Sequence, residues 1–554
     1  MSTYGPREWH PDERPLFPGS PSTPAHSTER RIAYFCVGSL VTVTAGLGNA
    51  LVSANLFNLQ GPLGAYFTEI NWLPTAYVMT NASMNLLLVK FRQQFGLRAF
   101  TEFFMALYAL LTVAHLFVGG LGSAIAVRAA HGIAGAAMST LGLFYTLQAF
   151  DRPNRFRGII ASLGVAQLPL PIAYVFSSDL LRFGEWRGLY LFELGITVVA
   201  MACVFALKLP PGDRIKAFRP MDFLTFALFA PGVALLAVTL TFGRLLWWRD
   251  TAWIGVALAA SIVLIVASFY VEHTRRNPLL NLRWMANGSI CRLALGLVLV
   301  RIVLAEQSIG AVGMMRALGL NNDQLTTLFT VILLATVLGL IVAAATTNIQ
   351  HLLAPQGIGL AIMSLGAFIA SFANSLTRPE EMYLSQGMLG FGGAMFLGPL
   401  VVSLIGRVIA EPANLVSFAV LFSATQNMGS LVGSSLLGTF QVWREKYHSS
   451  ILVEHLSALD PQVAARIARG GAAFGRALAD PAGRAHQGLA ALSAATAREA
   501  NILAYNDVFL LIAAIAALHA AWVFGRAAWE KYVEPPALPA PIPQPDTRPE
   551  QVTD

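Results

Sequence analysis

The stretch Val331-Ile-Leu-Leu-Ala-Thr336-Val-Leu-Gly-Leu-Ile-Val-Ala-Ala-Ala345 contains one polar side chain, that of Thr336, and no charged side chain. A membrane-spanning β-strand alternates apolar and polar residues over about 10 positions, and this stretch does not. A continuous apolar segment in lipid satisfies its backbone N–H and C=O groups as an α-helix. Together with the apolar residues before it, the stretch approaches the roughly 20 residues that cross a bilayer core. It therefore predicts a transmembrane helix over residues 325–345.

The rest of the chain has the same character. Of its 554 residues 55% are hydrophobic and 12% are charged, and the mean hydropathy is +0.59. This leaves too little polar surface to cover a water-soluble globule. We expect an all-α integral membrane protein with about fourteen transmembrane helices. The expected spans are 32–57, 71–89, 101–120, 122–148, 158–179, 188–208, 222–242, 252–271, 290–311, 325–345, 353–374, 383–406, 413–438 and 502–525.

Basic residues divide unequally between alternate connections of these spans. One set of connections carries Lys90, Arg92, Arg98, Arg152, Arg155, Arg157, Lys208, Arg214, Lys216, Arg219, Arg275, Arg276, Arg283 and Arg407. The alternate set carries Arg182, Arg187, Arg244, Arg249, Arg316 and Arg378. Since basic connections remain in the cytoplasm, and since an even number of spans places both ends on one side, we expect both termini to be cytoplasmic.

Several function classes find no support in the sequence. The net charge of +7 comes from short basic clusters between hydrophobic runs, so nucleic acid is not an expected partner. The three cysteines have no metal-ligand spacing, and no metal site is expected. The chain has no Walker-type Gly-rich loop, no H-E-x-x-H and no Gly-x-Ser-x-Gly. We therefore expect no enzyme and no cofactor, with an ion gradient as the energy source.

Three segments lie outside the expected spans. Residues 1–30 and 533–554 are rich in Pro and polar residues, and we expect disordered cytoplasmic tails there. Residues 440–501 form a long connection that the topology places in the periplasm. Its Ala-rich part, 462–500, carries charges at helical intervals and predicts one or two amphipathic helices.

The string Arg128-Ala-Ala-His131-Gly132-Ile-Ala-Gly135 resembles the R-x-x-Q-G signature of major facilitator drug antiporters, with His131 in place of Gln. The string from Leu47 to Gly61, followed by Trp72, is similar to the first two spans of the drug:H+ antiporter-2 family, which has fourteen spans. The resemblance implies a major facilitator fold in a bacterial inner membrane. It divides the chain into a six-helix bundle (31–208), two additional helices with flanking loops (209–287) and a second six-helix bundle (288–532).

The sequence also departs from that family. The loop signature G-x-L-a-D-r-x-G-r-r is represented by Val89-Lys-Phe-Arg-Gln-Gln-Phe-Gly96-Leu-Arg98, which lacks the Asp. The span-5 signature G-P-x-x-G-G is reduced to Leu170-Pro171-Ile-Ala-Tyr174-Val175, and Gly429 stands where an Arg is frequent. The first-span acid is absent as well. The fold therefore carries over, whereas the coupling mechanism does not.

Four ionisable residues, Arg128, Glu193, Arg301 and Glu306, lie several positions inside apolar runs. A buried charge costs about 2.5–3.5 kcal/mol on insertion scales, so it faces a cavity or a partner. Arg128 is either a hydrogen-bonding anchor between spans or a cation of the cavity, and Glu193 either contributes to function or snorkels to the membrane surface. Arg301 and Glu306 are about 140° apart around one helix, so each needs its own partner, and at least one should line the cavity.

These residues complete a predicted substrate and proton pathway. Its neutral members are Asn49, His131, Gln426 and Asn427, which either bind substrate or join helices. The expected structural motif residues are Gly96, Gly132, Gly135 and Pro171.

The leading hypothesis is proton-coupled efflux of an amphipathic or aromatic small molecule by alternating access. Expected partners are the lipid bilayer and a small organic substrate; the resemblance adds a periplasmic membrane-fusion adaptor and an outer-membrane channel as candidates. Uptake or facilitated diffusion and a non-transporting membrane sensor are the alternatives.

Overall fold

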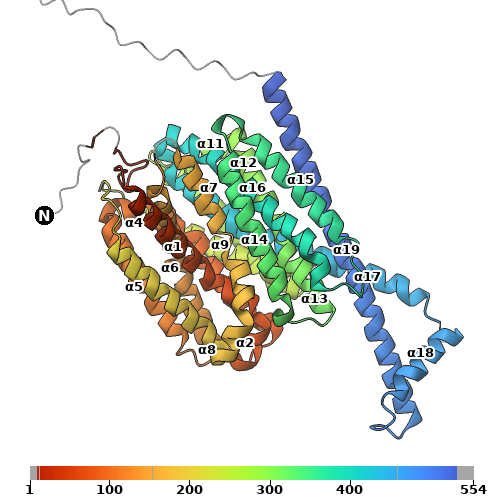
Figure 1. The fold of residues 1–554 in the computed structure, drawn as a ribbon. Helices are drawn as coiled ribbons and strands as arrows, with labels where there is room; N and C mark the ends of the chain where they lie inside the picture. The colour runs from red at the N-terminus through yellow and green to blue at the C-terminus, as the bar shows by residue number, and fades with distance from the viewer. Residues whose placement is uncertain (1–8, 11–12, 152–153, 458, 533–554) are drawn as a thin grey trace, which may run out of the picture.

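The computed structural model describes residues 9–10, 13–151, 154–457 and 459–532. Long helices packed into one bundle make up this part of the chain (Figure 1), as the hydropathy predicts. The helices of the first half are α1 (Thr28–Ala54), α2 (Leu56–Leu63), α3 (Phe67–Ile70), α4 (Trp72–Phe95), α5 (Leu97–His115), α6 (Leu121–Gln148), α7 (Arg155–Val165), α8 (Pro169–Ala206), α9 (Pro220–Leu245) and α10 (Ala252–Thr274). Those of the second half are α11 (Leu282–Met285), α12 (Gly288–Leu304), α13 (Val312–Ala317), α14 (Asn322–Thr346), α15 (Leu353–Ala370), α16 (Tyr383–Ala410), α17 (Leu415–Glu454), α18 (Pro461–Ala472) and α19 (Pro481–Tyr532).

Thirteen helical segments among the described residues are long and apolar enough to cross a membrane. Each matches one of the expected spans. The remaining expected span, 71–89, corresponds to α4, whose polar residues include Asn81, Asn85 and Lys90 and lower its hydropathy. α4 nevertheless packs inside the bundle, against α6, α9 and α17. The chain is a multi-pass membrane protein.

α8 contains the later part of the expected span 158–179 and nearly all of the span 188–208, because the chain reverses direction within it. A Cβ atom added to Gly188 would lie 2.0 Å from the backbone oxygen of Leu180. Residues eight apart in a straight helix are separated by about 12 Å along the axis. The two arms of α8 therefore form a tight hairpin, and Gly188 permits the close approach.

The helices form two groups that follow chain order. α1, α4, α5, α6, α7 and α8 pack among themselves, as do α12, α14, α15, α16, α17 and α19. α9 and α10 form an additional pair, and α9 contacts α4 of the first group and α17 of the second. The groups meet where α4 contacts α17 and where α7 and α8 contact α14. This arrangement creates a central space bounded by both groups.

The expected disorder of residues 1–30 is wrong for residues 13–27. Ser20 and Ser22 are each only 3% exposed. The backbone of Ser22 donates to Pro211 (3.0 Å) and accepts from the Gln148 side chain (3.0 Å). Phe17 packs against the hydrophobic core. Polar groups at the helix ends thus satisfy the segment's backbone, which the composition does not reveal. The expected tail 533–554 lies outside the described residues.

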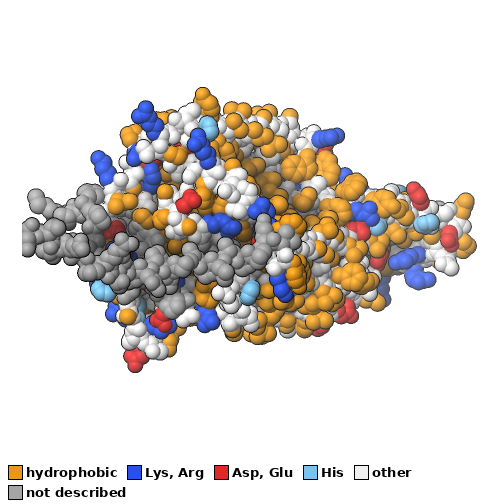
Figure 2. All heavy atoms as spheres, turned by 90° about the horizontal axis from the view of Figure 1, so that it is seen from above, with side chains coloured by type: hydrophobic (Ala, Val, Ile, Leu, Met, Phe, Trp, Pro, Cys, Tyr) orange, Lys and Arg blue, Asp and Glu red, His pale blue; other side chains and the backbone are white. Residues whose placement is uncertain are grey.

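The long connection 440–501 is mostly helical rather than a loop. α17 continues to Glu454, α18 follows, and α19 begins at Pro481 and runs into the last span without a break. Its Ala-rich composition favours helix even outside lipid. Figure 1 shows α18 projecting from one end of the bundle, whereas α1 begins and α19 ends at the opposite end. Viewed from the latter end, Lys and Arg side chains are spread over the surface and hydrophobic side chains cover the flanks (Figure 2).

Candidate functional site

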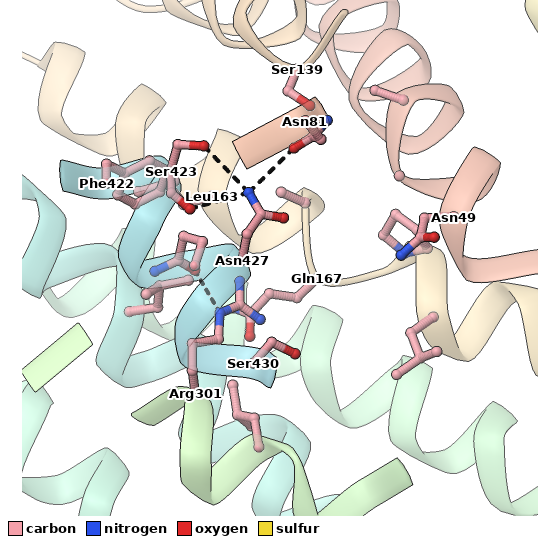
Figure 3. A pocket seen from close by; sticks show the side chains of 18 of the residues that line it. Asn49, Asn81, Ser139, Leu163, Gln167, Arg301, Phe422, Ser423, Asn427 and Ser430 are labelled. Atoms are coloured by element: carbon pink, nitrogen blue, oxygen red, sulfur yellow. Dashed lines mark hydrogen bonds between the residues drawn. The ribbon is translucent and has the colours of Figure 1, made fainter. Parts of the chain in front are cut away.

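A cavity of about 1310 Å³ lies between the two helix groups. Its lining comes from α1, α4, α6, α7 and α8 on one side and from α12, α14, α16 and α17 on the other. Of the residues predicted for the pathway, the structure brings Asn49, Arg301, Gln426 and Asn427 to this cavity. Figure 3 shows several of these side chains facing the same space. The cavity is therefore shared by both halves of the molecule.

Arg301 extends from α12 into the cavity (Figure 3). Its Nε donates a 2.6 Å hydrogen bond to Oε1 of Gln426 on α17. No ion pair joins Arg301 to a carboxylate among the described residues. Gly429 makes room for its stem, since a Cβ atom there would lie 3.2 Å from Arg301 Cβ. The guanidinium therefore presents its terminal N–H groups to the cavity.

A chain of amide and hydroxyl groups joins α4 to α17 across the cavity wall. Asn427 Nδ2 donates to Asn81 Oδ1 (3.2 Å), and Asn85 Nδ2 donates to Ser423 Oγ (3.0 Å). Asn81 and Asn85 are four residues apart on α4, so they lie on one helix face. Hydrogen bonds of this kind hold helices together without a hydrophobic driving force. Asn427 thus joins helices and lines the cavity at the same time (Figure 3).

Arg128 is fully buried and does not line the cavity. It donates from α6 to Gly48 O (2.5 Å) and Asn49 Oδ1 (2.8 Å) on α1, and to Leu73 O on α4 (3.4 Å). Its guanidinium carbon also lies 4.8 Å from the centre of the Tyr77 ring. This is the geometry of an anchor that joins three helices, the first of the two interpretations of Arg128.

Glu193 lies in the core of the first helix group, 1% exposed, so it does not snorkel to the membrane surface. Its Oε1 is 2.7 Å from the hydroxyl of Tyr108 and 3.3 Å from Nε2 of His131. The Tyr108 hydroxyl also lies 2.9 Å from Thr44 O. One hydroxyl proton cannot serve both acceptors in straight hydrogen bonds. If Glu193 carries a proton, it donates to Tyr108 and both contacts are satisfied.

Glu306 occupies a corresponding buried place in the second group, at 0% exposure. Gln386 Nε2 on α16 donates to its Oε1 (2.8 Å), and Oε2 has no hydrogen-bond partner. Arg301 and Glu306 therefore have separate partners, as their positions around the helix predict. A π-helix follows at Gln307–Ala311, and Gln307 lines the cavity. π-helical turns are frequent at functional sites.

The predicted glycines act through close packing and backbone conformation. A Cβ atom on Gly132 would lie 2.3 Å from Tyr77 O, and one on Gly135 would lie 2.1 Å from Tyr77 Oη. Both glycines therefore let α6 approach α4. Gly96 ends α4 with φ +86°, a conformation that favours glycine.

Pro171 lies in the first turn of α8, where a helix needs no backbone N–H donor. It lines the cavity. Three residues later, the Tyr174 ring stacks on Phe329 of α14, with centroids 3.9 Å apart and planes at 7°. The bulky residue of span 5 thus makes a contact between the two helix groups.

A polar contact also joins the two helix groups, at the end of the bundle where Tyr174 stacks on Phe329. Asn322, at the start of α14, donates to Ala54 O (2.9 Å) and Ser177 Oγ (3.2 Å), and lies 3.5 Å from Asn55 Oδ1. All four residues lie at the end opposite the start of α1. This cluster holds the two helix groups together beside the cavity.

Several residues that contact the buried carboxyls or line the cavity were not predicted as site residues from the sequence. Tyr108 and Gln386 are ordinary membrane residues by composition, and only the fold brings them to Glu193 and Glu306. The spacing of Asn81 and Asn85 could have marked a polar face on α4. Basic residues interpreted only as topology signals also line the cavity: Arg92, Arg155, Arg244, Arg316 and Arg407.

The structure is that of a membrane protein in which two helix groups enclose a cavity large enough for a small molecule.

No protein-family model matches the chain. It is 26% identical to the multidrug transporter mfsC of Aspergillus fumigatus over 266 residues, 47% of this chain and 50% of that protein. It is 26% identical to the vacuolar membrane amino acid uptake transporter fnx2 of Schizosaccharomyces pombe over 246 residues, 42% of this chain and 41% of that protein. The chain thus spans about half the length of these two curated relatives.

A longer match, at 20% identity over 436 residues, joins 76% of the chain to 80% of the MFS-type transporter YhcA of Bacillus subtilis. Among solved structures, the human organic anion transporter MFSD10 aligns with a TM-score of 0.53, 12% identity and coverage of 89% of this chain and 100% of that one. The proton:xylose symporter XylE aligns with a TM-score of 0.50, 14% identity and coverage of 90% and 100%. The chain has the major facilitator fold, and mfsC and YhcA are named as transporters of that superfamily.

Proposed function

We propose that this protein is a secondary active transporter that moves an organic small molecule across the membrane by alternating access. The central cavity carries the proposal, because it lies between two helix groups and takes its lining from both. In transporters of this type, a site between two bundles opens to one side and then to the other as the bundles rock. A cavity of about 1310 Å³ exceeds the range of most drug-sized ligand sites.

Efflux coupled to protons is the proposed direction and energy source. Glu193 and Glu306 support it, because each is a buried carboxyl with one neutral hydrogen-bond partner at 2.7–2.8 Å and one oxygen without a partner. A carboxyl in such a place can bind and release a proton when the surrounding helices move. The multidrug transporter among the relatives, mfsC, supports export of amphipathic compounds.

The finer assignment is to the fourteen-span drug:H+ antiporter-2 type. α9 and α10 support it, because they form a pair in addition to two groups of six spans. With it come a bacterial inner-membrane location, cytoplasmic termini and a periplasmic adaptor with an outer-membrane channel. The projecting helices around α18 are the part of the chain that would face such an adaptor (Figure 1).

Uptake is the second candidate. The relative fnx2 supports it, since its name describes uptake of amino acids at the vacuolar membrane. The cavity itself is compatible with either direction.

Accumulation in cells tests the proposal. A strain lacking the gene is compared with one that overproduces the protein, using a panel of aromatic anions, cations and neutral compounds. Export predicts lower intracellular accumulation of at least one compound in the producing strain, and a protonophore should abolish the difference. Higher accumulation would establish uptake instead. Equal accumulation of every compound would contradict transport.

A further inference from the structure

The charged side chains that line the cavity are all positive. Of the described residues that line it, six are arginines, and none is Asp, Glu, Lys or His. They are Arg92, Arg155, Arg244, Arg301, Arg316 and Arg407. Arg301 lies near the middle of the helical segment from Gly288 to Ala317, and the other arginines lie near helix ends. Positive charge therefore lines the cavity along its length.

Five of these arginines differ from basic side chains such as Lys90 and Arg275, which are paired with acids. Lys90 lies 2.5 Å from Asp222, and Arg275 binds both Asp222 (2.7 Å) and Glu272 (2.5 Å). By contrast, Arg92, Arg244, Arg301, Arg316 and Arg407 form no salt bridge among the described residues. The two membrane carboxyls, Glu193 and Glu306, lie in the helix groups and not in the cavity lining.

Several buried donors in the wall lack protein partners, and Arg92 and Gln426 each carry one. Arg92 is 3% exposed and its Nε has no hydrogen-bond partner, although its guanidinium lies 4.5 Å from the Phe144 ring centre. Gln426 uses its carbonyl oxygen to accept from Arg301, so its unpartnered group is the Nε2 donor. Leaving a buried polar group without a partner is unfavourable. Both donors would be satisfied by a ligand rich in acceptors.

Apolar side chains complete the lining, among them Phe144, Phe418 and Phe422. From the five arginines that form no salt bridge among the described residues, the free donors and these rings, we propose that the transported compound is an amphipathic organic anion whose charged group binds Arg301 and Gln426. The proposal rests on the proposed transport function and adds the substrate class. A guanidinium binds carboxylate and phosphate groups in bidentate fashion, which favours Arg over Lys at this place.

Binding to the purified full-length protein tests the class without requiring transport. Three probes share one ring system and differ in charge: 1-naphthylacetate, 1-naphthylacetamide and (1-naphthylmethyl)trimethylammonium. Titration calorimetry at low salt should give the anion at least about 10-fold higher affinity than the other two, because hydrogen bonds between a guanidinium and a carboxylate are stronger than those to a neutral amide. Equal or tighter binding of the cation would overturn the proposal.

Variants locate the interaction. Arg301→Gln should lower the affinity for 1-naphthylacetate by about 10-fold or more and leave the amide unaffected, and Arg301→Lys should retain part of the affinity. Arg98→Gln is the matched control, since Arg98 is exposed and bound to Glu102. Unchanged anion binding in Arg301→Gln would refute the assignment. If that variant fails to fold, Arg301→Lys and the probe series on the unaltered protein decide.

Two further experiments follow. The first distinguishes a lipid from a water-soluble anion, and the second tests the substrate class separately from the transport function. Displacement of 1-naphthylacetate by dihexanoyl phosphatidylglycerol, but not by dihexanoyl phosphatidylcholine, would assign the same anionic chemistry to a lipid; no displacement would assign it to a water-soluble anion. In proteoliposomes, anion binding without transport of any probe would reject the transport function and keep the substrate class. Gradient-driven transport of the cation without anion binding would keep the transport function and reject the anionic substrate class.

Discussion

Arg301 Nε and Gln426 Oε1 are 2.6 Å apart, and this hydrogen bond joins α12 to α17 at the cavity wall. The bond orients the guanidinium and fixes which end of the Gln426 amide is free. Both consequences can be tested by changing the acceptor while Arg301 is kept.

Gln426→Glu should weaken binding of 1-naphthylacetate by about 10-fold or more at neutral pH, because a carboxylate beside the guanidinium would pair with it and repel an anion. Gln426→Leu should weaken binding less, since it removes a donor but adds no charge. Titration calorimetry compares the two variants. Equal losses would contradict the expected repulsion of the anion by a carboxylate at position 426.

Arg128→Gln should destabilise the protein, because Arg128 donates to Gly48, Asn49 and Leu73 from the buried side of α6. Losing charge-assisted hydrogen bonds to buried acceptors costs about 1.5–3 kcal/mol each. A fall of several degrees in the thermal unfolding midpoint is expected in detergent, with anion affinity near that of the unaltered protein. Arg182→Gln, at an exposed site, is the control. An unchanged midpoint together with lost binding would place Arg128 in the binding site.

Glu306→Gln should abolish transport driven by a pH gradient and leave downhill exchange of substrate intact. The amide can still accept from Gln386 Nε2 through its oxygen, so the local contact is preserved while proton exchange is lost. Proteoliposomes with and without an imposed gradient measure the two activities, and Glu102→Gln, on the exposed face of α5, serves as the control. Undiminished gradient-driven transport would remove Glu306 from coupling and direct attention to Glu193.

A phosphatase inserted after Leu478, between α18 and α19, should be active, and one fused to the C-terminus should be inactive. The connection between α18 and α19 and the end of α19 lie at opposite ends of the bundle (Figure 1), and the basic connections favour the cytoplasm for the chain ends. A green fluorescent protein fused to the C-terminus should fluoresce. Phosphatase activity at the C-terminus would invert the topology.

Hydropathy predicted most of the fold, because each run such as 325–345 has one way to satisfy its backbone in lipid. It could not predict that residues 13–27 pack, since Gln148 and Pro211 are brought to that segment only by the tertiary structure. Depth within a span identified Arg301, Glu193 and Glu306 as buried or facing a cavity.

The partners of these residues were not predictable in the same way. Tyr108 and Gln386 come from distant helices, and no local pattern marks them. The basic residues near the ends of the spans have two roles. Arg92 and Arg316 are topology signals by their positions, and they are also cavity residues because α4 and α13 border the central space.

Alternating access is most directly tested by locking one end of the cavity. In a chain with Cys36, Cys203 and Cys291 replaced by Ala, Asn55→Cys and Asn322→Cys would place two thiols at the contact that joins the helix groups. Ser430→Cys reports access to the cavity, since Ser430 lines it and is exposed there (Figure 3). A membrane-impermeant maleimide is applied to either face of membrane vesicles.

Before oxidation, the cysteine at 430 should react from both faces. After the disulfide forms, it should react only from the face where α1 begins, transport should stop, and dithiothreitol should restore both. Undiminished labelling from both faces with the disulfide in place would contradict alternating access through this cavity.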